Sequence, residues 1–360
     1  MAIYLDETQR AALAGMAQSR TWRSQWPTWL LIATIYGGWF GTATHARELG
    51  LPLTTLLLVL FSTWYMSLQH ELLHGHPTRS ARLNASFGFA PLAVWFPYGA
   101  YRDSHLQHHD DPHLTHPERD PESYFVAHVT WIRAGAPIRA LLTFRNTFIG
   151  RMLVGPAFAI AATHVAALAR IRRGDWRDVP MWLAHFAALA ALTLWLQQSC
   201  AFPAWLFIVG VGYGALSLSS VRSFQEHRAA HEHAHRTVVN EAAWIWRLLF
   251  LNNNYHAVHH DLPHVPWFAL KRVYEARREA YLERNGGFLV KGYREWLTRY
   301  ALSAVGSCVH PQSEHAADNG KGSGVDSRPR FSPLPWTGNG RRLERSTIAA
   351  DFQTRAERQR

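Results

Sequence analysis

The chain has 360 residues, and its hydrophobic residues, 48% of the total, are gathered into long runs, which indicates a membrane protein rather than a soluble globule. Its two cysteines, Cys200 and Cys308, lie far apart and match no C-x-x-C pattern, which excludes an iron–sulfur ligand set, a zinc ribbon and a disulfide framework. The formal net charge is +11, but the basic residues form no nucleic-acid motif, so we expect an anionic membrane surface and no nucleic acid as partner.

The N-terminal segment is mixed and polar, with Asp6 and Glu7 near its start. It lacks the short apolar core and the small-residue cleavage site of a signal peptide. We predict that residues 1–25 form a cytoplasmic segment and that the hydrophobic run after it remains in the mature protein.

Four runs have the length and apolarity of spanning helices. They form two hairpins with short connections, so both connections lie on one side of the bilayer. Arginines precede the first and third runs, and this positive-inside bias places the larger, opposite side in the cytoplasm. The predicted spans are 26–44, 51–68, 180–197 and 202–220.

Two further segments, 85–98 and 152–169, are apolar but carry prolines. If only one of them crossed the membrane, the histidine clusters described next would lie on opposite sides of the bilayer. We therefore predict that both are interfacial or re-entrant.

The fold class that follows is all-α: an integral membrane helical bundle with four spanning helices in two hairpins and a cytoplasmic helical cap. We assign residues 26–300 to this domain. The remainder, 301–360, is rich in Gly, Ser, Pro and Arg, and we predict a disordered basic tail.

The first histidine cluster, HELLHGH, directly follows the second span. His70 and His74 are four residues apart and share one helix face, so two imidazoles there can hold one metal ion. His76 lies about 200° further round the helix from His74 and is a less certain ligand.

Two later clusters share the spacing HxxHH, with histidines at i, i+3 and i+4. A lone interfacial histidine is more often a satisfied polar residue than a ligand. Three on one helix face serve no packing purpose and would repel one another once protonated, so the repeat indicates metal binding. Its members are His105, His108 and His109, then His256, His259 and His260.

His227 follows the fourth span in the sequence SFQEHR. Nearby, His231, His233 and His235 alternate with other residues beside arginines, which is typical of a solvated loop, so His231 is kept only as a less certain ligand. The remaining histidines have no partner at ligand spacing: His113, His116, His128, His164, His185, His264, His310 and His315.

The number of histidines favours two ions. Imidazole suits zinc, copper, nickel and iron, but a single zinc site uses three or four protein ligands. Two redox-active irons can together supply the electrons that split dioxygen, which zinc cannot. Nearby carboxylates are candidates to orient the far ring nitrogens, or are ordinary surface charges: Glu71, Asp103, Asp110, Asp111, Asp120, Glu226 and Asp261.

The ordered motifs HELLHGH, HLQHHD, EHR and NNNYHAVHH resemble the membrane fatty acid desaturase superfamily, which includes acyl-lipid desaturases, alkane hydroxylases and carotenoid ketolases. The phrases HPTRSARLNASFGF, YRDSHLQHHDD and NGGFLVKGYREW look most like its bacterial branch of the rhizopine-catabolism type. The resemblance implies two iron ions, a need for dioxygen, and ligands at His70, His74, His105, His108, His109, His227, His256, His259 and His260.

Two positions depart from the acyl-coenzyme A desaturases of that superfamily. Ser223 stands where those enzymes have an Asn four residues before the lone histidine, so Ser223 is a less certain ligand. The first histidine cluster has the spacing HxxxH, which is shorter than in those enzymes and closer to that of hydroxylases and ketolases.

Three functions remain open, while a non-enzymatic metal transporter or sensor is disfavoured because the predicted spans carry almost no residues that could bind a metal, with His185 alone in the third. The first is a dioxygen-dependent desaturase of lipid acyl chains, and the second a di-iron hydroxylase or ketolase acting on a lipid or hydrocarbon. Both need electrons from an external ferredoxin, rubredoxin or cytochrome, since the chain has no haem, flavin or iron–sulfur motif. Both place the protein in a bacterial inner membrane with its histidines facing the cytoplasm. The third is a membrane zinc protease, since His70 to His74 also reads HExxH with Glu71 as general base, but it leaves both HxxHH clusters unexplained.

Overall fold

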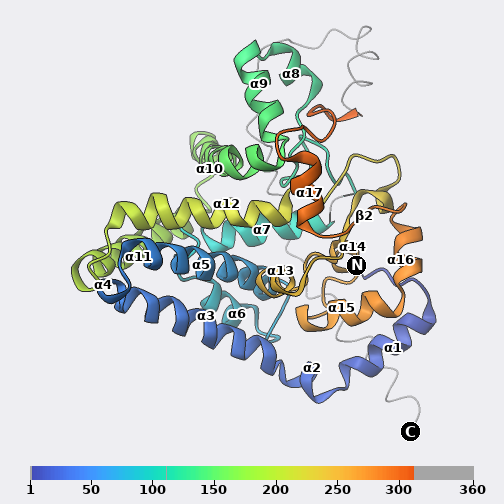
Figure 1. The fold of residues 1–360 in the computed structure, drawn as a ribbon, viewed down its shortest axis with the longest axis horizontal. Coiled ribbons are helices and arrows are strands. Elements are labelled where there is room, and N and C mark those ends of the chain that lie inside the picture. The colour runs from blue at the N-terminus through green and yellow to red at the C-terminus, as the bar shows by residue number, and fades with distance from the viewer. Residues whose placement is uncertain (1, 111, 312–360) are drawn as a thin grey trace.

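The computed structural model describes residues 2–110 and 112–311. Within them the chain is mostly α-helical, and its one sheet is a parallel pair, β1 (Val239–Asn240) and β2 (Leu289–Val290) (Figure 1). The predicted all-α membrane bundle is confirmed. Asp111, His315 and most of the predicted tail lie outside the described residues.

The first hairpin consists of α3 (Trp26–Thr44) and α5 (Leu51–Leu73), joined by the short α4 (Ala46–Leu49). Proline in the first turn of both long helices suits these starts, because a first-turn residue has no helical acceptor for its N–H. The two helices pack closely: Trp39 Nε1 donates to Ser62 Oγ at 3.1 Å. A Cβ on Gly38 would lie 2.2 Å from Phe61 Cζ, so only glycine allows this approach.

The second hairpin consists of α11 (Val179–Ser199) and α12 (Tyr213–Ser223), and a π-helical stretch, Leu206–Gly212, leads directly into α12. The two hairpins meet near their connections. The ring of Trp195, late in α11, lies 5.6 Å from that of Phe40, late in α3, and Phe207 lies 5.8 Å from Trp39. Both short connections therefore lie at one end of the bundle, at the left in Figure 1.

The other end of the bundle carries the cap. Helices α1 (Glu7–Ala17) and α2 (Arg20–Ser24) precede the bundle, yet α1 packs on the cap: Gln9 Nε2 donates to the Tyr281 hydroxyl at 2.7 Å, and the Ile3 N–H to the Asp261 carbonyl at 2.7 Å. The remaining helices are α6 (Ala81–Gly88), α7 (Tyr98–Asp110), α8 (His128–Arg133), α9 (Ala136–Arg145), α10 (Phe148–Arg172), α13 (Trp244–Leu249), α14 (His256–Asp261), α15 (Trp267–Ala276), α16 (Arg278–Arg284) and α17 (Tyr293–Tyr300).

By length and composition, four described helices could cross a membrane: α5, α10, α11 and the continuous helix Leu206–Ser223. The number agrees with the prediction, but two members differ. Helix α3 was predicted to span, yet its Trp, Tyr, Gly and Thr residues leave it outside this set. Segment 152–169 was predicted to be interfacial, yet it lies within the 25-residue α10, which is apolar enough to qualify.

The ends of α10 show how this helix lies in the bundle. At its start, the Phe148 ring contacts Phe224, one residue beyond α12, at 5.2 Å. At its end, Arg170 pairs with Asp175 and Asp178, just before α11 begins. Both contacts are at the cap side of the hairpin helices, so α10 does not run from one end of the bundle to the other. Helix α3, in contrast, accompanies α5 from the cap to the connection (Figure 1).

Segment 85–98 is not a continuous helix. It contains the end of α6 and a series of turns that lead to α7. The bundle anchors these turns through hydrogen bonds to their carbonyls: the Tyr65 hydroxyl donates to Ala90 at 2.9 Å, and His185 Nε2 lies 2.9 Å from the Val94 oxygen.

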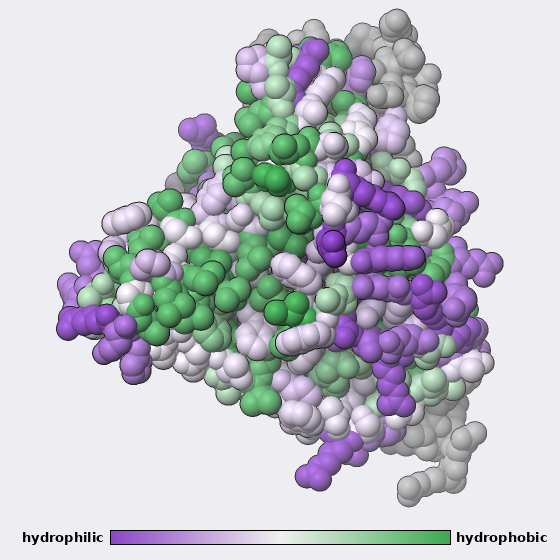
Figure 2. Space-filling view, viewed as in Figure 1, coloured by the Kyte–Doolittle hydropathy of each residue, from purple (hydrophilic) through white to green (hydrophobic). Residues whose placement is uncertain are grey.

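The surface shows the same division into bundle and cap as the fold. Figure 2 shows an apolar region over the bundle, between hydrophilic residues at its left tip and the hydrophilic cap at the right. Large exposed apolar side chains of the bundle include Leu30, Leu56, Leu183, Leu194 and Val209. An exposed apolar belt of this kind marks a membrane-contacting surface.

Residues 301–311, here called the C-terminal strap, were predicted to belong to the tail but pack against the folded part. The Ile149 N–H donates to the Ala301 carbonyl at 3.0 Å, Val305 to Asn146 at 3.0 Å, and Val126 to Cys308 at 2.8 Å. The rest of that prediction concerns residues 312–360, which are not described.

Candidate metal centre

All nine histidines predicted as ligands come together in two groups, each of buried and partly buried residues, at the junction of bundle and cap. Within each group, the nitrogen atoms that could bind a metal lie within 4.8 Å of one another. The first group contains His70, His74, His105, His109 and His259, and the second contains His108, His227, His256 and His260.

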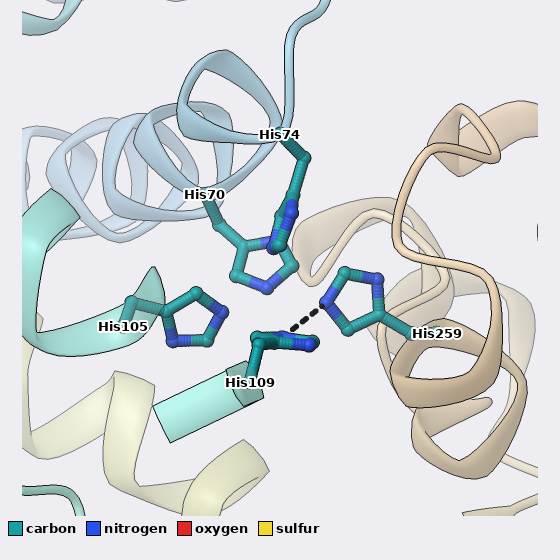
Figure 3. A group of neighbouring side chains, drawn as sticks. All are labelled: His70, His74, His105, His109 and His259. Carbon is teal, nitrogen blue, oxygen red and sulfur yellow. Dashed lines mark hydrogen bonds between the residues drawn. The ribbon is translucent and has the colours of Figure 1, made fainter. Parts of the chain in front are cut away.

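Three helices build the first group. Helix α5 ends at Leu73 with His74 as its C-cap, and Gly75 follows with a φ of +92°, a left-handed conformation that terminates helices at low strain. The last turn of α5 thus presents His70 and His74 together, and Figure 3 shows their rings facing those from α7 and α14. His109 Nε2 and His259 Nε2 lie 3.0 Å apart. His74 Nε2 and His105 Nε2 are buried without a hydrogen-bond partner, so both can bind a metal.

The second group forms a chain of close ring nitrogens. His227 Nε2 lies 3.1 Å from His108 Nε2 and 3.1 Å from His256 Nε2, and His260 Nε2 lies 3.2 Å from His256 Nε2. Histidine nitrogens about 2.0–2.1 Å from one ion would be separated by about 2.9–3.4 Å, depending on the coordination angle. The observed separations fit a shared metal ion.

The two HxxHH clusters divide their histidines between the groups. In α7 the i and i+4 residues, His105 and His109, join the first group, while His108 joins the second. In α14 the assignment is reversed: His256 and His260 join the second group and His259 the first. Between the groups, the rings of His109 and His260 stack at 4.2 Å. The two groups therefore form one centre.

The protonation of these rings suits metal binding. Burial, reinforced by neighbouring histidines, holds the pKa of His109, His256, His259 and His260 well below the ordinary value. The pKa of His227 is lowered in the same way, first by burial and then by His108. These imidazoles are neutral at pH 7, which leaves a nitrogen lone pair for a metal.

Two carboxylates of one loop hold the far nitrogens of two ligands. Asp120 Oδ1 lies 2.8 Å from His108 Nδ1, and Glu122 Oε1 lies 3.0 Å from His105 Nδ1. Burial alone would lower the pKa of His108, but Asp120 and then Glu122 raise it to about 9. Burial alone would raise the pKa of Glu122, but His105 and His108 lower it to about 2. Asp120 was among the predicted carboxylates; Glu122 was missed because it lies 17 residues from His105 in sequence.

The other predicted carboxylates differ in their distance from the ligands. Glu226 Oε1 lies 3.7 Å from His256 Nδ1 and accepts from Arg222 at 2.8 Å. Glu71 Oε1 lies 4.0 Å from His70 Nδ1, while its Oε2 accepts the Trp267 N–H.

Three of the carboxylates predicted to orient ligands are directed elsewhere. Asp261 pairs with Arg284 at 2.8 Å and Asp103 with Arg102 at 2.6 Å. Asp110 is exposed at the end of α7. None of these three makes a described contact with a ligand ring.

The less certain ligands lie outside both groups. Helix α5 stops before His76, whose Nε2 lies 3.2 Å from the His264 carbonyl oxygen. Ser223 Oγ lies 3.2 Å from the Tyr124 hydroxyl. His231 is exposed in a loop, as predicted for its stretch of alternating histidines.

Sequence reasoning also missed Asn253, which lies within the quoted motif NNNYHAVHH. Its Oδ1 is 3.1 Å from His256 Nδ1, and its Nδ2 is 3.4 Å from His70 Nε2. Asn253 thus touches one histidine of each group. Its place within this motif was the signal in the sequence, which histidine spacing alone does not mark.

Comparison with known proteins gives a matching family model, described as fatty acid desaturase, over residues 48–291. This range covers more than half of the chain and includes all nine histidines of the centre. No curated protein matches the chain. Together with the four candidate spans and the two histidine groups, the match shows that the chain belongs to the fatty acid desaturase family.

Proposed function

We propose that the chain is a membrane di-iron, dioxygen-dependent desaturase that acts on the acyl chains of lipids. The observation that carries this proposal is the convergence of nine histidines into two adjoining groups, each able to hold one metal ion. In the proposal, each group binds one iron. The motif phrases quoted above favour the bacterial branch of the rhizopine-catabolism type.

The irons, when bound, supply the electrons with which dioxygen is activated to remove hydrogen from an unactivated C–H bond. The chain's own residues prepare the site for this chemistry. Asp120 and Glu122 accept the Nδ1 protons of His108 and His105, which orients both rings so that Nε2 is the nitrogen that would bind a metal. Burial of the rings keeps bulk water away from the reacting atoms.

The location of the centre favours a lipid substrate. His70 and His74 lie at the cap end of α5, a candidate span, so the centre adjoins the apolar belt where acyl chains pack. We place the protein in a bacterial inner membrane with the cap in the cytoplasm. The electrons come from a separate ferredoxin, rubredoxin or cytochrome-type donor.

One observation favours a second candidate, a di-iron hydroxylase or ketolase of the same family. The first box is HxxxH, and both of its histidines join the first group. This short spacing was the departure that pointed to hydroxylases. Both reactions begin with removal of one hydrogen from the substrate. The position of the acyl chain then decides whether a second hydrogen is removed, which gives a double bond, or oxygen is added to the carbon, which gives an alcohol.

The zinc protease is disfavoured by the surroundings of HExxH. A catalytic zinc site uses three protein ligands and keeps one position open for water. Here three further histidines surround His70 and His74. Glu71 is 2% exposed and bonded to the Trp267 N–H, so it does not act as a free general base.

The test combines metal analysis with lipid profiling of the expressing cells. We expect one iron per histidine group, and a new unsaturated or hydroxylated lipid that disappears in His108→Ala but persists in His231→Ala, an exposed histidine outside both groups. An unsaturated product supports the desaturase, and an alcohol or ketone supports the second candidate. A single zinc ion with an unchanged lipid profile would refute the proposal.

A further inference from the structure

The loop 113–123 serves both histidine groups at once. It carries Asp120, which contacts His108 of the second group, and Glu122, which contacts His105 of the first. The Glu122 N–H also donates to Asp120 Oδ1 at 2.9 Å. Contacts that hold this loop in place therefore also hold both carboxylates against their histidines.

Thr115 lies in the turn of this loop and connects its two ends. Its N–H donates to Asp120 Oδ2 at 2.7 Å, and its carbonyl accepts from Ser123 Oγ at 2.6 Å. Its φ is +77°, a left-handed conformation that a β-branched residue rarely adopts, and it is 2% exposed. Such a conformation persists only where the surrounding structure holds it.

The C-terminal strap provides a contact that holds Thr115. His310 Nε2 lies 3.1 Å from Thr115 Oγ1, and both residues are buried. The strap is also bonded to the chain just after the loop: Val126 and Val309 form an isolated parallel bridge, and the His310 N–H donates to the Val126 carbonyl at 3.1 Å. The His310 ring is bounded by the rings of His116 and Phe125.

These contacts form a continuous path from the strap to a ligand. It runs from His310 to the Thr115 hydroxyl, from the Thr115 N–H to Asp120, and from Asp120 to His108. His310 lies 195 residues after Thr115, so no local spacing in the sequence reveals this path.

We propose that His310 is a positioning residue of the metal centre: by holding Thr115 in its left-handed conformation, it keeps Asp120 against His108. The C-terminal strap thereby determines how tightly the second histidine group holds its metal. This inference rests on the proposed binding of iron by the two groups.

The decisive variants change the contact between strap and loop from either side, because His310 also contacts the rings of His116 and Phe125 and Thr115→Val leaves those ring contacts in place. His310→Ala removes it, and His310→Gln keeps a side-chain nitrogen that can reach the Thr115 hydroxyl. Thr115→Val removes the hydroxyl but keeps the β-branched shape. The matched control is His164→Ala, a histidine whose ring lies against Trp182, away from the strap.

The measurement is iron release to a chelator from the purified full chain, together with the Mössbauer spectrum of protein loaded with ⁵⁷Fe. We expect His310→Ala and Thr115→Val each to release one of the two irons about tenfold faster and to alter the spectrum of that iron, because loss of an outer contact weakens metal binding. His310→Gln should restore the wild-type rate. The double variant His310→Ala with Thr115→Val should be no faster than either single variant, because both remove the same contact.

The inference fails if His310→Ala releases both irons equally fast, or if its rates and spectrum match those of wild type and His164→Ala. If His310→Ala does not fold, Thr115→Val decides between the same outcomes. A wild-type chain that binds no iron overturns the proposed function and this inference together. Normal iron binding in wild type with unaffected variants overturns the inference alone.

Discussion

Replacement of Asp120 by Asn tests whether a buried carboxylate controls one half of the centre. Asp120 is 1% exposed and accepts three hydrogen bonds: from His108 Nδ1 at 2.8 Å, from the Thr115 N–H at 2.7 Å and from the Glu122 N–H at 2.9 Å. The substitution keeps the shape of the side chain but removes its charge and one acceptor oxygen.

The expected loss follows from these three bonds. Asn has a single acceptor oxygen, so in either orientation of the amide its NH₂ faces at least one donor. Loss of a hydrogen bond to a charged acceptor in a buried place is worth about 1.5–3 kcal/mol. Removal of a carboxylate that orients a ligand typically weakens metal binding about 10–100-fold, or about 1.4–2.8 kcal/mol. The two estimates agree.

The assay is competition for iron with a chelator of known affinity, with ⁵⁷Fe Mössbauer spectra to separate the two groups. We expect Asp120→Asn to weaken iron binding by the group that contains His108, and Glu122→Gln to weaken binding by the group that contains His105. Asp103→Asn is the control, since Asp103 pairs with Arg102 and contacts no ligand ring. Equal affinities in Asp120→Asn and Asp103→Asn would show that the carboxylate does not act through His108.

Three further predictions concern stability. Gly38→Ala should lower the free energy of unfolding by about 1–3 kcal/mol, because its Cβ meets the Phe61 ring, whereas Gly37→Ala, with open space around its Cβ, should not; denaturation in detergent compares them. In chelator-treated protein the His108–Asp120 pair should stabilise the fold fully below about pH 6.5, and this contribution should be lost as the pH rises through about 9, because the folded-state pKa of His108 is raised. The measurement is the melting temperature from pH 6 to 10, and an equal decline in wild type and Asp120→Asn would contradict this prediction. Removal of metal should itself lower the melting temperature, since an ion that binds only the folded state stabilises it, and an unchanged melting curve after chelation would count against metal binding by the histidines.

Much of the bundle could be predicted from the sequence because long apolar runs leave few alternatives. Segments 51–68 and 180–197 fall within α5 and α11. The prediction was weakest where composition and arrangement disagree. Helix α10 is apolar enough to span, and only its contacts with Phe224 and with Asp178 show that it does not connect the two ends of the bundle.

The candidate site was predicted as a set of residues but not as an arrangement. Spacing and resemblance identified the nine histidines, yet nothing local indicates that His108 and His109, which are neighbours in sequence, belong to different groups. That division depends on how α14 faces α7, which is set by tertiary packing. Glu122 and His310 were missed for the same reason, since each reaches the centre only through a fold of the chain.

The division of α7 and α14 between the two groups has a mechanical consequence. Within each helix, residues three and four positions apart are separated along the axis by about 4.5 Å and about 6 Å. We therefore expect the distance between the two metal positions to depend more on helix pitch than on the loops. Insertions in the connections between helices should leave that distance unchanged, whereas a single residue inserted between His105 and His108, or between His256 and His259, would rotate one set of ligands by about 100° and dismantle both metal positions together.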